Sequence, residues 1–278
     1  MIKDMVANIS SASRGDHPAG DFAVSVAAAF GAHLTGVAFA HKPDIAPDLF
    51  AGLPADIIET AAAENEKQAR EMAERFLAAA AKAGVGADCD VASLTFDGAA
   101  EFFSRKIRVT DLAVVGQPDP DAPESNDMLV ERALFESGRP IVAVPYIHRG
   151  PLKLDRVMVS WDGSRAAARA AGDALPFLLR AGAIEIVPVT AKKNPDEPPA
   201  SADDMARHLA KHGLKAEVHR LYAADIDVPS ALLSYAADSA IDFMVMGGYG
   251  HSRLREFVLG GATRGILDSM TLPVLMSH

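Results

Sequence analysis

Short apolar runs alternate along the chain with longer amphipathic stretches. In the second half, strands are expected at Val157–Ser160, Ile184–Val189, Ala216–Leu221, Phe243–Met246 and Val274–Met276. Between them, helices are expected at Arg165–Arg180, Asp203–His212, Pro229–Ser239 and Ala262–Met270. Strands that are apolar throughout and separated by helices predict an α/β fold, in which a parallel sheet is covered on both faces.

Three segments of the first half recur, in the same order, in the second half. The pairs are Thr110–Gly116 with Ile241–Gly247, Arg139–Val144 with Leu272–Met276, and Lys3–Ile9 with Arg156–Trp161. Such self-similarity predicts one five-stranded unit duplicated in tandem, with domains at 1–148 and 152–278. The first domain differs by a longer second helix, expected at Pro54–Ala83.

Composition narrows the class of protein. The chain has 278 residues, a formal net charge of −10, and Cys89 as its one cysteine, so a disulfide framework is excluded. The acidic balance argues against nucleic-acid binding. No apolar run approaches the roughly 18 residues of a membrane span, and no signal peptide is evident. A cytoplasmic protein, without nucleic-acid or membrane partners, is expected.

The negative charge is unevenly shared between the two halves. Residues 1–150 carry 13 Lys and Arg against 22 Asp and Glu, a net charge of −9, whereas residues 151–278 carry 14 against 15, a net charge of −1. Only the second half could readily host a polyanionic ligand.

The most informative stretch is 247–264, between the fourth predicted strand and the last helix of the second half. It holds five glycines and four basic residues: Gly247, Gly248, Gly250, His251, Arg253, Arg255, Gly260, Gly261 and Arg264. Glycines let backbone amides approach a ligand, and free amides at a helix N-terminus attract anions. The stretch therefore predicts a phosphate site, although glycines also serve simply to end strands and begin helices.

Competing phosphate and catalytic motifs do not fit this stretch. A dinucleotide fingerprint would need a third glycine where Arg253 stands, and neither a Gly-Lys-Ser/Thr tripeptide nor a G-x-S-x-G elbow occurs.

The spacing Gly247-x-x-Gly250, nine residues, Gly260-Gly261 resembles the motif of the universal stress protein family. The strand that ends in Trp161-Asp162 resembles the first strand of that family. The resemblance covers the chain as two tandem domains, clear in the second and diffuse in the first. It implies Rossmann-like domains of the adenine nucleotide-binding type, packed as an intramolecular pseudo-dimer through the edge strands near Ile141–Val144 and Val274–Met276.

The resemblance also implies a ligand, ATP, with Mg²⁺ as its companion ion. In family members that bind ATP, the aspartate after the first strand lies near the ribose and adenine, the backbone at the end of the second strand contacts adenine, and the glycine stretch holds the phosphates. The residues that match these positions or flank them are Trp161, Asp162, Val189, Gly247, Gly250, His251, Arg253, Gly260, Gly261, Ala262 and Thr263.

The chain departs from the family pattern in two places. Gly261 stands where the family usually has Ser or Thr, so a hydroxyl donor is lost, and affinity is expected to fall about tenfold without abolishing binding. In the first half, Gly116 is followed by Gln117-Pro118 and three acids, and the helix expected at Met128–Glu136 opens with no glycine. The first half is expected to be a structural partner that cannot hold ATP in the same way.

Other residues have plainer interpretations beside functional ones. Asp162 could cap the next helix, and Trp161 could pack in the core rather than stack on a base. His208 and His212 are spaced i and i+4, and we interpret them as part of a solvated helix face rather than as a metal site. We interpret Cys89 as a passive thiol rather than as a nucleophile. The charged run Glu64–Arg75 favours a solvated helix face, with partner recruitment as the alternative.

Three classes of function remain at this point. The first is a stress-response protein that binds an adenine nucleotide in its second domain. The second is a scaffold that binds no nucleotide and recruits protein partners. The third is a slow ATPase or self-phosphorylating protein, for which only His251, Ser252 and Thr263 offer reactive groups, so no catalytic residue is assigned. A homodimer of the whole chain is an open possibility.

Overall fold

The computed structural model describes residues 1–10, 18–42, 55–118, 123–190, 202–223, 226–248 and 261–278. Contacts between Cα atoms divide the chain into two compact units. One holds essentially residues 2–139, and the other holds residues 140–148 and 152–278. Among the described residues, no helix combines the length and the apolarity needed to cross a membrane.

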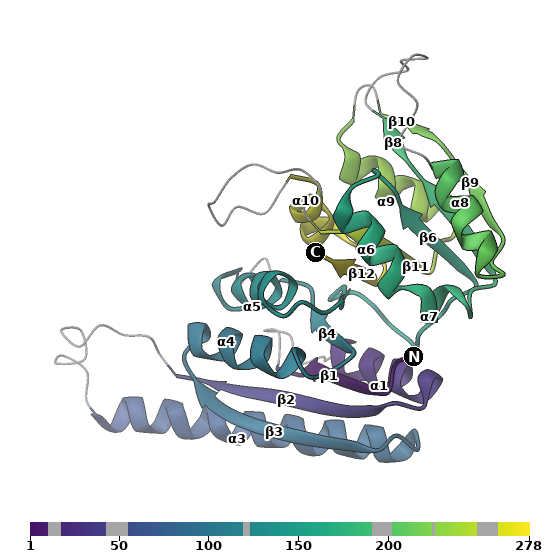
Figure 1. Ribbon diagram of the computed structural model, residues 1–278. Coiled ribbons are helices and arrows are strands. Elements are labelled where there is room, and N and C mark those ends of the chain that lie inside the picture. The colour runs from purple at the N-terminus through teal and green to yellow at the C-terminus, as the bar shows by residue number, and fades with distance from the viewer. Residues whose placement is uncertain (11–17, 43–54, 119–122, 191–201, 224–225, 249–260) are drawn as a thin grey trace. The chain divides into compact units, whose positions relative to one another are not determined.

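The first unit contains four strands in the order β3-β2-β1-β4, all parallel. They are β1 (Asp4–Asn8), β2 (His33–His41), β3 (Ala87–Leu94) and β4 (Leu112–Gly116). Its helices are α1 (Pro18–Phe30), α3 (Ala55–Lys82), α4 (Phe96–Ile107) and α5 (Pro123–Glu136). Helix α3 packs on β2 and β3, and α4 packs with α5 on the other side of the sheet (Figure 1).

The second unit has strand order β5-β12-β11-β6-β7-β9, with β5 (Ile141–Val144) antiparallel to β12. Its other strands are β6 (Arg156–Ser160), β7 (Ala183–Val187), β9 (Ala216–Val218), β11 (Phe243–Gly247) and β12 (Val274–Ser277), with a separate parallel pair β8 (Val189–Thr190) and β10 (Leu221–Tyr222). The helices are α6 (Arg165–Asp173), α7 (Leu175–Leu178), α8 (Ala202–Lys211), α9 (Val228–Asp238) and α10 (Gly261–Ser269).

Strand registers in the two units agree with the offsets of the sequence repeat. Met5 lies opposite Leu112 in the first unit, and Val157 lies opposite Phe243 in the second. The acid that recurs in the repeat has the same task in both units. The carboxylate of Asp111 accepts hydrogen bonds from the amides of Lys3 (2.7 Å) and Asp4 (3.1 Å), and Asp242 accepts one from the amide of Arg156 (3.0 Å). Each acid thereby fastens the start of its neighbouring strand.

Two expected elements are each divided by a proline. The helix expected at Arg165–Arg180 is two helices, α6 and α7, because Pro176 has no N–H for the carbonyl of Gly172 and its ring would clash there. The strand expected at Ile184–Val189 ends at Val187, and after Pro188 the chain pairs with β10 instead. The α/β class is confirmed.

The compact units do not follow the sequence repeat at one strand. Strand β5 is the fifth strand of the first half in chain order, yet it belongs to the second compact unit because it pairs with β12. Val142 lies opposite Leu275, and the flanking pairs are Ile141 with Met276 and Ala143 with Val274. The pairing of these two segments agrees with the edge-strand prediction.

Candidate functional site

The candidate site lies at the carboxyl ends of β6 and β11, which are neighbours in the sheet. The chain passes from β6 to β7 on one side, whereas β11 and β12 lie on the other, so the winding of the sheet reverses between β6 and β11. Asp162 follows β6, and Gly247 is the last residue of β11. Open α/β sheets generally bind ligands at such a reversal.

Asp162 is exposed and takes part in a local turn. Its Oδ1 accepts a hydrogen bond from the amide of Ser164 at 2.9 Å. The hydroxyl of Ser164 in turn accepts one from the amide of Ala167 at 3.1 Å, so Ser164 is the N-cap of α6. The capping role considered for Asp162 therefore belongs to Ser164, and the Asp162 carboxylate remains at the surface beside the end of β6.

Trp161 is buried, with 8% of its surface exposed. Its amide donates to the carbonyl of Val187 at 3.1 Å, as the amide of Ile9 donates to Val37 at 2.9 Å in the first unit. Because Trp161 occupies the position of a core isoleucine, its burial favours packing over stacking on a base.

Gly247 lies against the backbone of α6. A Cβ atom at this position would stand 2.4 Å from the amide nitrogen of Ala167 and 2.6 Å from the carbonyl carbon of Ala166. Neither backbone atom can move aside as a flexible side chain could. Gly247 is therefore required for the close approach of β11 and α6, whether or not a ligand is bound.

Val189 lies in β8, where it pairs with Leu221, and it is half-buried. The carbonyl of the preceding residue, Pro188, accepts a hydrogen bond from the amide of Leu221 at 3.0 Å. The break at Pro188 thus carries the backbone of Val189 out of the main sheet and into the short β8–β10 pair.

Helix α10 begins at the far end of the glycine stretch. Gly261 and Ala262 are exposed in its first turn. Among the described residues, apart from the chain neighbours of Gly261 and its own helix backbone, no atom lies within 4 Å of the place where a Cβ of Gly261 would stand. Thr263, by contrast, is only 2% exposed. The remaining predicted residues, Gly250, His251, Arg253 and Gly260, and with them Ser252, lie outside the described residues.

The corresponding edge of the first unit carries buried residues in place of the exposed acid. Asn8, Gln117 and Pro118 are all buried there. The Asn8 side chain accepts from the amide of Ser10 at 3.0 Å, and the Ser10 hydroxyl accepts from the amide of Phe39 at 2.8 Å.

A buried carboxylate at Glu185 was missed by sequence reasoning. It lies in β7 with a side chain 4% exposed, paired with the Arg156 guanidinium and accepting from the Tyr235 hydroxyl at 2.6 Å. Burial alone would raise its pKa, but the hydrogen bonds from Tyr235 and Arg156 outweigh burial and lower the pKa. The available signal was an acid in the apolar run Ala183–Val187.

Two further candidates have no reactive environment. The rings of His208, on the exposed side of α8, and of His212, in the exposed turn that follows α8, are 4.9 Å apart. The described ranges contain no group of three or more His, Cys, Asp or Glu able to hold a metal ion. Burial, followed by the charge of Asp90, raises the pKa of the Cys89 thiol to about 11. A thiol with that pKa is a poor nucleophile at neutral pH.

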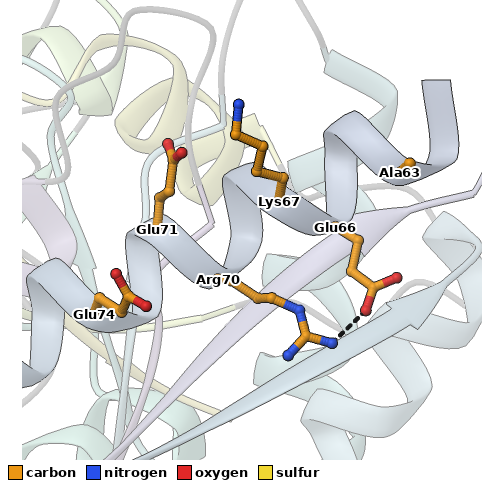
Figure 2. A pocket seen from close by; sticks show the side chains of 6 residues that line it. All are labelled: Ala63, Glu66, Lys67, Arg70, Glu71 and Glu74. Atoms are coloured by element: carbon orange, nitrogen blue, oxygen red, sulfur yellow. Dashed lines mark hydrogen bonds and ion pairs between the residues drawn. The ribbon is translucent and has the colours of Figure 1, made fainter. Parts of the chain in front are cut away.

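A groove of about 490 Å³ runs along α3, far in sequence from the motif residues. Its lining residues all come from this one helix: Ala63, Glu66, Lys67, Arg70, Glu71 and Glu74 (Figure 2). Arg70 pairs with Glu66 at 2.5 Å. Residues of both charges on one helix, with no second element lining the groove, are typical of a solvated helix face.

Comparison with known proteins finds one family model that matches most of the second unit. Residues 153–278 match the model of the universal stress protein family. Universal stress protein Slr1230 from Synechocystis is 30% identical over 151 residues, which are 52% of this chain and 49% of that protein. The chain therefore spans about half the length of this curated relative.

Among solved structures, the chain is similar to a universal stress protein from Archaeoglobus fulgidus, with a TM-score of 0.69, 14% identity, and coverage of 98% of this chain and 97% of the other. A functionally unknown protein from Pseudomonas aeruginosa PAO1 gives a TM-score of 0.60 at 13% identity, with coverage of 99% and 92%. At such identities the likeness shows the fold alone. Residues 153–278 are therefore similar to the universal stress protein family, and this match covers less than half of the chain.

Proposed function

We propose that the second unit binds an adenine nucleotide, ATP, at the carboxyl ends of β6 and β11. The observation that carries this proposal is the placement of Asp162 and Gly247 at the ends of adjacent strands, where the winding of the sheet reverses. This position is where a nucleotide would meet both the acid after the first strand and the start of the glycine stretch.

Each part of the site has a chemical task in this proposal. The exposed carboxylate of Asp162 would accept hydrogen bonds from the ribose, and the backbone at Val189 would contact the base. The first turn of α10, exposed at Gly261 and Ala262, would present backbone amides and the positive end of the helix dipole to phosphate oxygens. Mg²⁺ would enter with the nucleotide, held mainly by its phosphates.

Asp162→Asn tests the proposal without disturbing the turn, because asparagine keeps the Oδ1 that accepts from Ser164. We expect ATP to raise the melting temperature of the wild type and to bind measurably in calorimetry, and we expect the variant to bind several-fold more weakly. Asp21→Asn, the same change at an exposed position of α1, is the matched control. A wild type that shows neither a shift nor heat at millimolar ATP would refute the proposal.

The biological role that follows is a stress-response function in the cytoplasm. The alternative is a scaffold that recruits proteins without binding a nucleotide. The charged groove of α3 is the observation that favours this alternative. Mass spectrometry of the purified protein separates the two, because a nucleotide carried through purification supports the first and contradicts the second. No turnover is assigned.

A further inference from the structure

We infer that the residue after the first strand of each unit, Ser10 or Asp162, decides whether that unit can present a backbone amide to a nucleotide base. In the first unit, the Ser10 hydroxyl binds this amide. In the second unit the amide is that of Val189, and it has no hydrogen-bond partner among the described residues. The inference rests on the proposed function, in which the backbone at Val189 contacts the base.

The hydrogen bonds of its neighbours show which way the peptide groups of Val189 point. The carbonyl of Pro188 accepts from the amide of Leu221 at 3.0 Å. The carbonyl of Thr190 accepts from the amide of Ala223 at 3.0 Å, so it points to the same side, that of β10. Because successive residues of an extended strand direct their peptide groups to opposite sides, the amide and carbonyl of Val189 point away from β10.

The opposite side is that of β6 and of the residues that follow it. The carbonyl of Val187 points there and accepts from the amide of Trp161 at 3.1 Å. The next residue, Asp162, directs its Oδ1 to the amide of Ser164 at 2.9 Å. Because this carboxylate binds within its own turn, the amide of Val189 remains a donor for a ligand atom.

The first unit has the same backbone arrangement at the matching position. The amide of Ile9 donates to the carbonyl of Val37 at 2.9 Å, which is the bond that Trp161 makes in the second unit. By the 150-residue offset between β2 and β7, Phe39 matches Val189. The amide of Phe39 is therefore the counterpart of the Val189 amide.

A side chain binds this amide in the first unit. The amide of Phe39 donates to the hydroxyl of Ser10 at 2.8 Å. The amide of Ser10 donates in turn to Oδ1 of the buried Asn8 at 3.0 Å, which holds the hydroxyl in place. Ser10 is the second residue after β1, as Asp162 is the second residue after β6. A base that required the Phe39 amide would have to displace this hydroxyl.

The test compares Asp162→Ser with Asp162→Ala. Both variants lose the carboxylate, and only the first gains a hydroxyl that can bind the Val189 amide as Ser10 binds Phe39. Calorimetry measures the dissociation constants of ATP and of inorganic triphosphate, which has no base. We expect Asp162→Ser to bind ATP about threefold to tenfold more weakly than Asp162→Ala, the contribution of one hydrogen bond. The two variants should bind triphosphate equally.

Hydrogen exchange of backbone amides tests the same contact without a ligand. Exchange at Phe39 should be faster in Ser10→Ala than in the wild type, and Ser10→Thr, which keeps the hydroxyl, should restore slow exchange. Ser25→Ala removes a hydroxyl that is bonded within α1, so this matched control should leave the exchange at Phe39 unchanged. Exchange at Val189 should be slower in Asp162→Ser than in Asp162→Ala.

The outcomes separate this inference from the proposed function. If the wild type binds ATP and the two Asp162 variants bind it equally, the inference is overturned and the proposed function stands. If both variants bind ATP too weakly to measure, equal exchange rates at Val189 overturn the inference. Equal exchange at Phe39 in the wild type and Ser10→Ala also overturns it. If the wild type binds no ATP, the proposed function fails and this inference fails with it, whatever the exchange rates are.

Discussion

The carboxyl edges of the two sheets are built on the same strand registers but end in different chemistry. In the second unit, β6 and β11 end in an exposed Asp162 and in Gly247, which packs directly on a helix. In the first unit, the matching edge is occupied by the buried side chains of Asn8 and Gln117. A duplicated frame can therefore keep its strand pairing while the residues at its carboxyl edge change from an exposed acid and a glycine to buried polar side chains.

The largest effect is expected for Gly247→Val. A side chain here would meet the backbone of Ala166 and Ala167 at well under contact distance, so β11 and α6 must separate. Overpacking of this kind costs roughly 3 kcal/mol or more. Chemical denaturation, monitored by hydrogen exchange, should show a lower free energy of unfolding in the second unit and an unchanged one in the first. If this variant loses ATP binding, the cause would be the disrupted packing of β11 on α6. If its stability equals that of the wild type, the packing role of Gly247 is wrong.

A smaller effect on stability is expected when the acids that bind the first strand of each unit are removed, and it should differ between the two units. Asp111 accepts two backbone amide hydrogen bonds, whereas Asp242 accepts one. Because a hydrogen bond to a charged group is worth roughly 1.5–3 kcal/mol at most and these sites are partly solvated, we expect Asp111→Ala to cost about 2 kcal/mol and Asp242→Ala about 1 kcal/mol. Urea denaturation of both variants measures the difference. Equal losses would show that the second amide bond of Asp111 contributes nothing.

Acid sensitivity should also differ between the units, because of Glu185. Its pKa is lowered in the folded state, so its contribution to stability is complete above the pKa of an unfolded glutamate and is lost as the pH falls through the lower, folded value. Thr35, which matches Glu185 by the 150-residue offset between β2 and β7, cannot titrate. Stability measured between pH 6 and pH 3 should fall less steeply in Glu185→Gln than in the wild type. An unchanged slope would argue against the pairing with Tyr235 and Arg156.

The smallest expected effect is an increase in ATP affinity. Gly261→Ser restores the hydroxyl that the family motif usually has, and a Cβ at Gly261 would meet no atom of the described residues outside its own helix and chain neighbours. One additional neutral hydrogen bond should tighten ATP binding up to about tenfold, as measured by calorimetry. Gly261→Ala adds the same Cβ without the hydroxyl and should leave the affinity unchanged. If both variants gain equally, the helix terminus and not the hydroxyl is responsible.

Much of the fold could be predicted because local patterns determine it. The long helix expected at Pro54–Ala83 spans Ala55–Lys82, since its amphipathic pattern continues without interruption. The pairing of the strands near Ile141–Val144 and Val274–Met276 was expected from the family resemblance, and β5 does pair with β12. The effect of Pro176 and Pro188 on their elements was underestimated.

The tasks of single site residues were harder to predict. Gly247 was interpreted as a ligand contact, but its closest neighbours, Ala166 and Ala167, are about 80 positions away in the sequence, and no local pattern reveals that packing. Glu185 was missed for the same reason, because its partners Arg156 and Tyr235 come from other elements. Contacts between distant segments decide these roles.

The pairing of β5 with β12 has a consequence for how the chain can be divided. The family match begins at residue 153, whereas the strand that covers β12 lies at Ile141–Val144. Within one chain this strand is supplied at a high effective concentration, since only a short connection separates it from β6. A protein cut at residue 152 would leave the backbone of β12 without this partner, and a strand edge of that kind pairs readily with another molecule. We expect such a fragment to dimerise or aggregate through the exposed edge of β12 more readily than a fragment that begins at residue 140, in which β5 still covers β12.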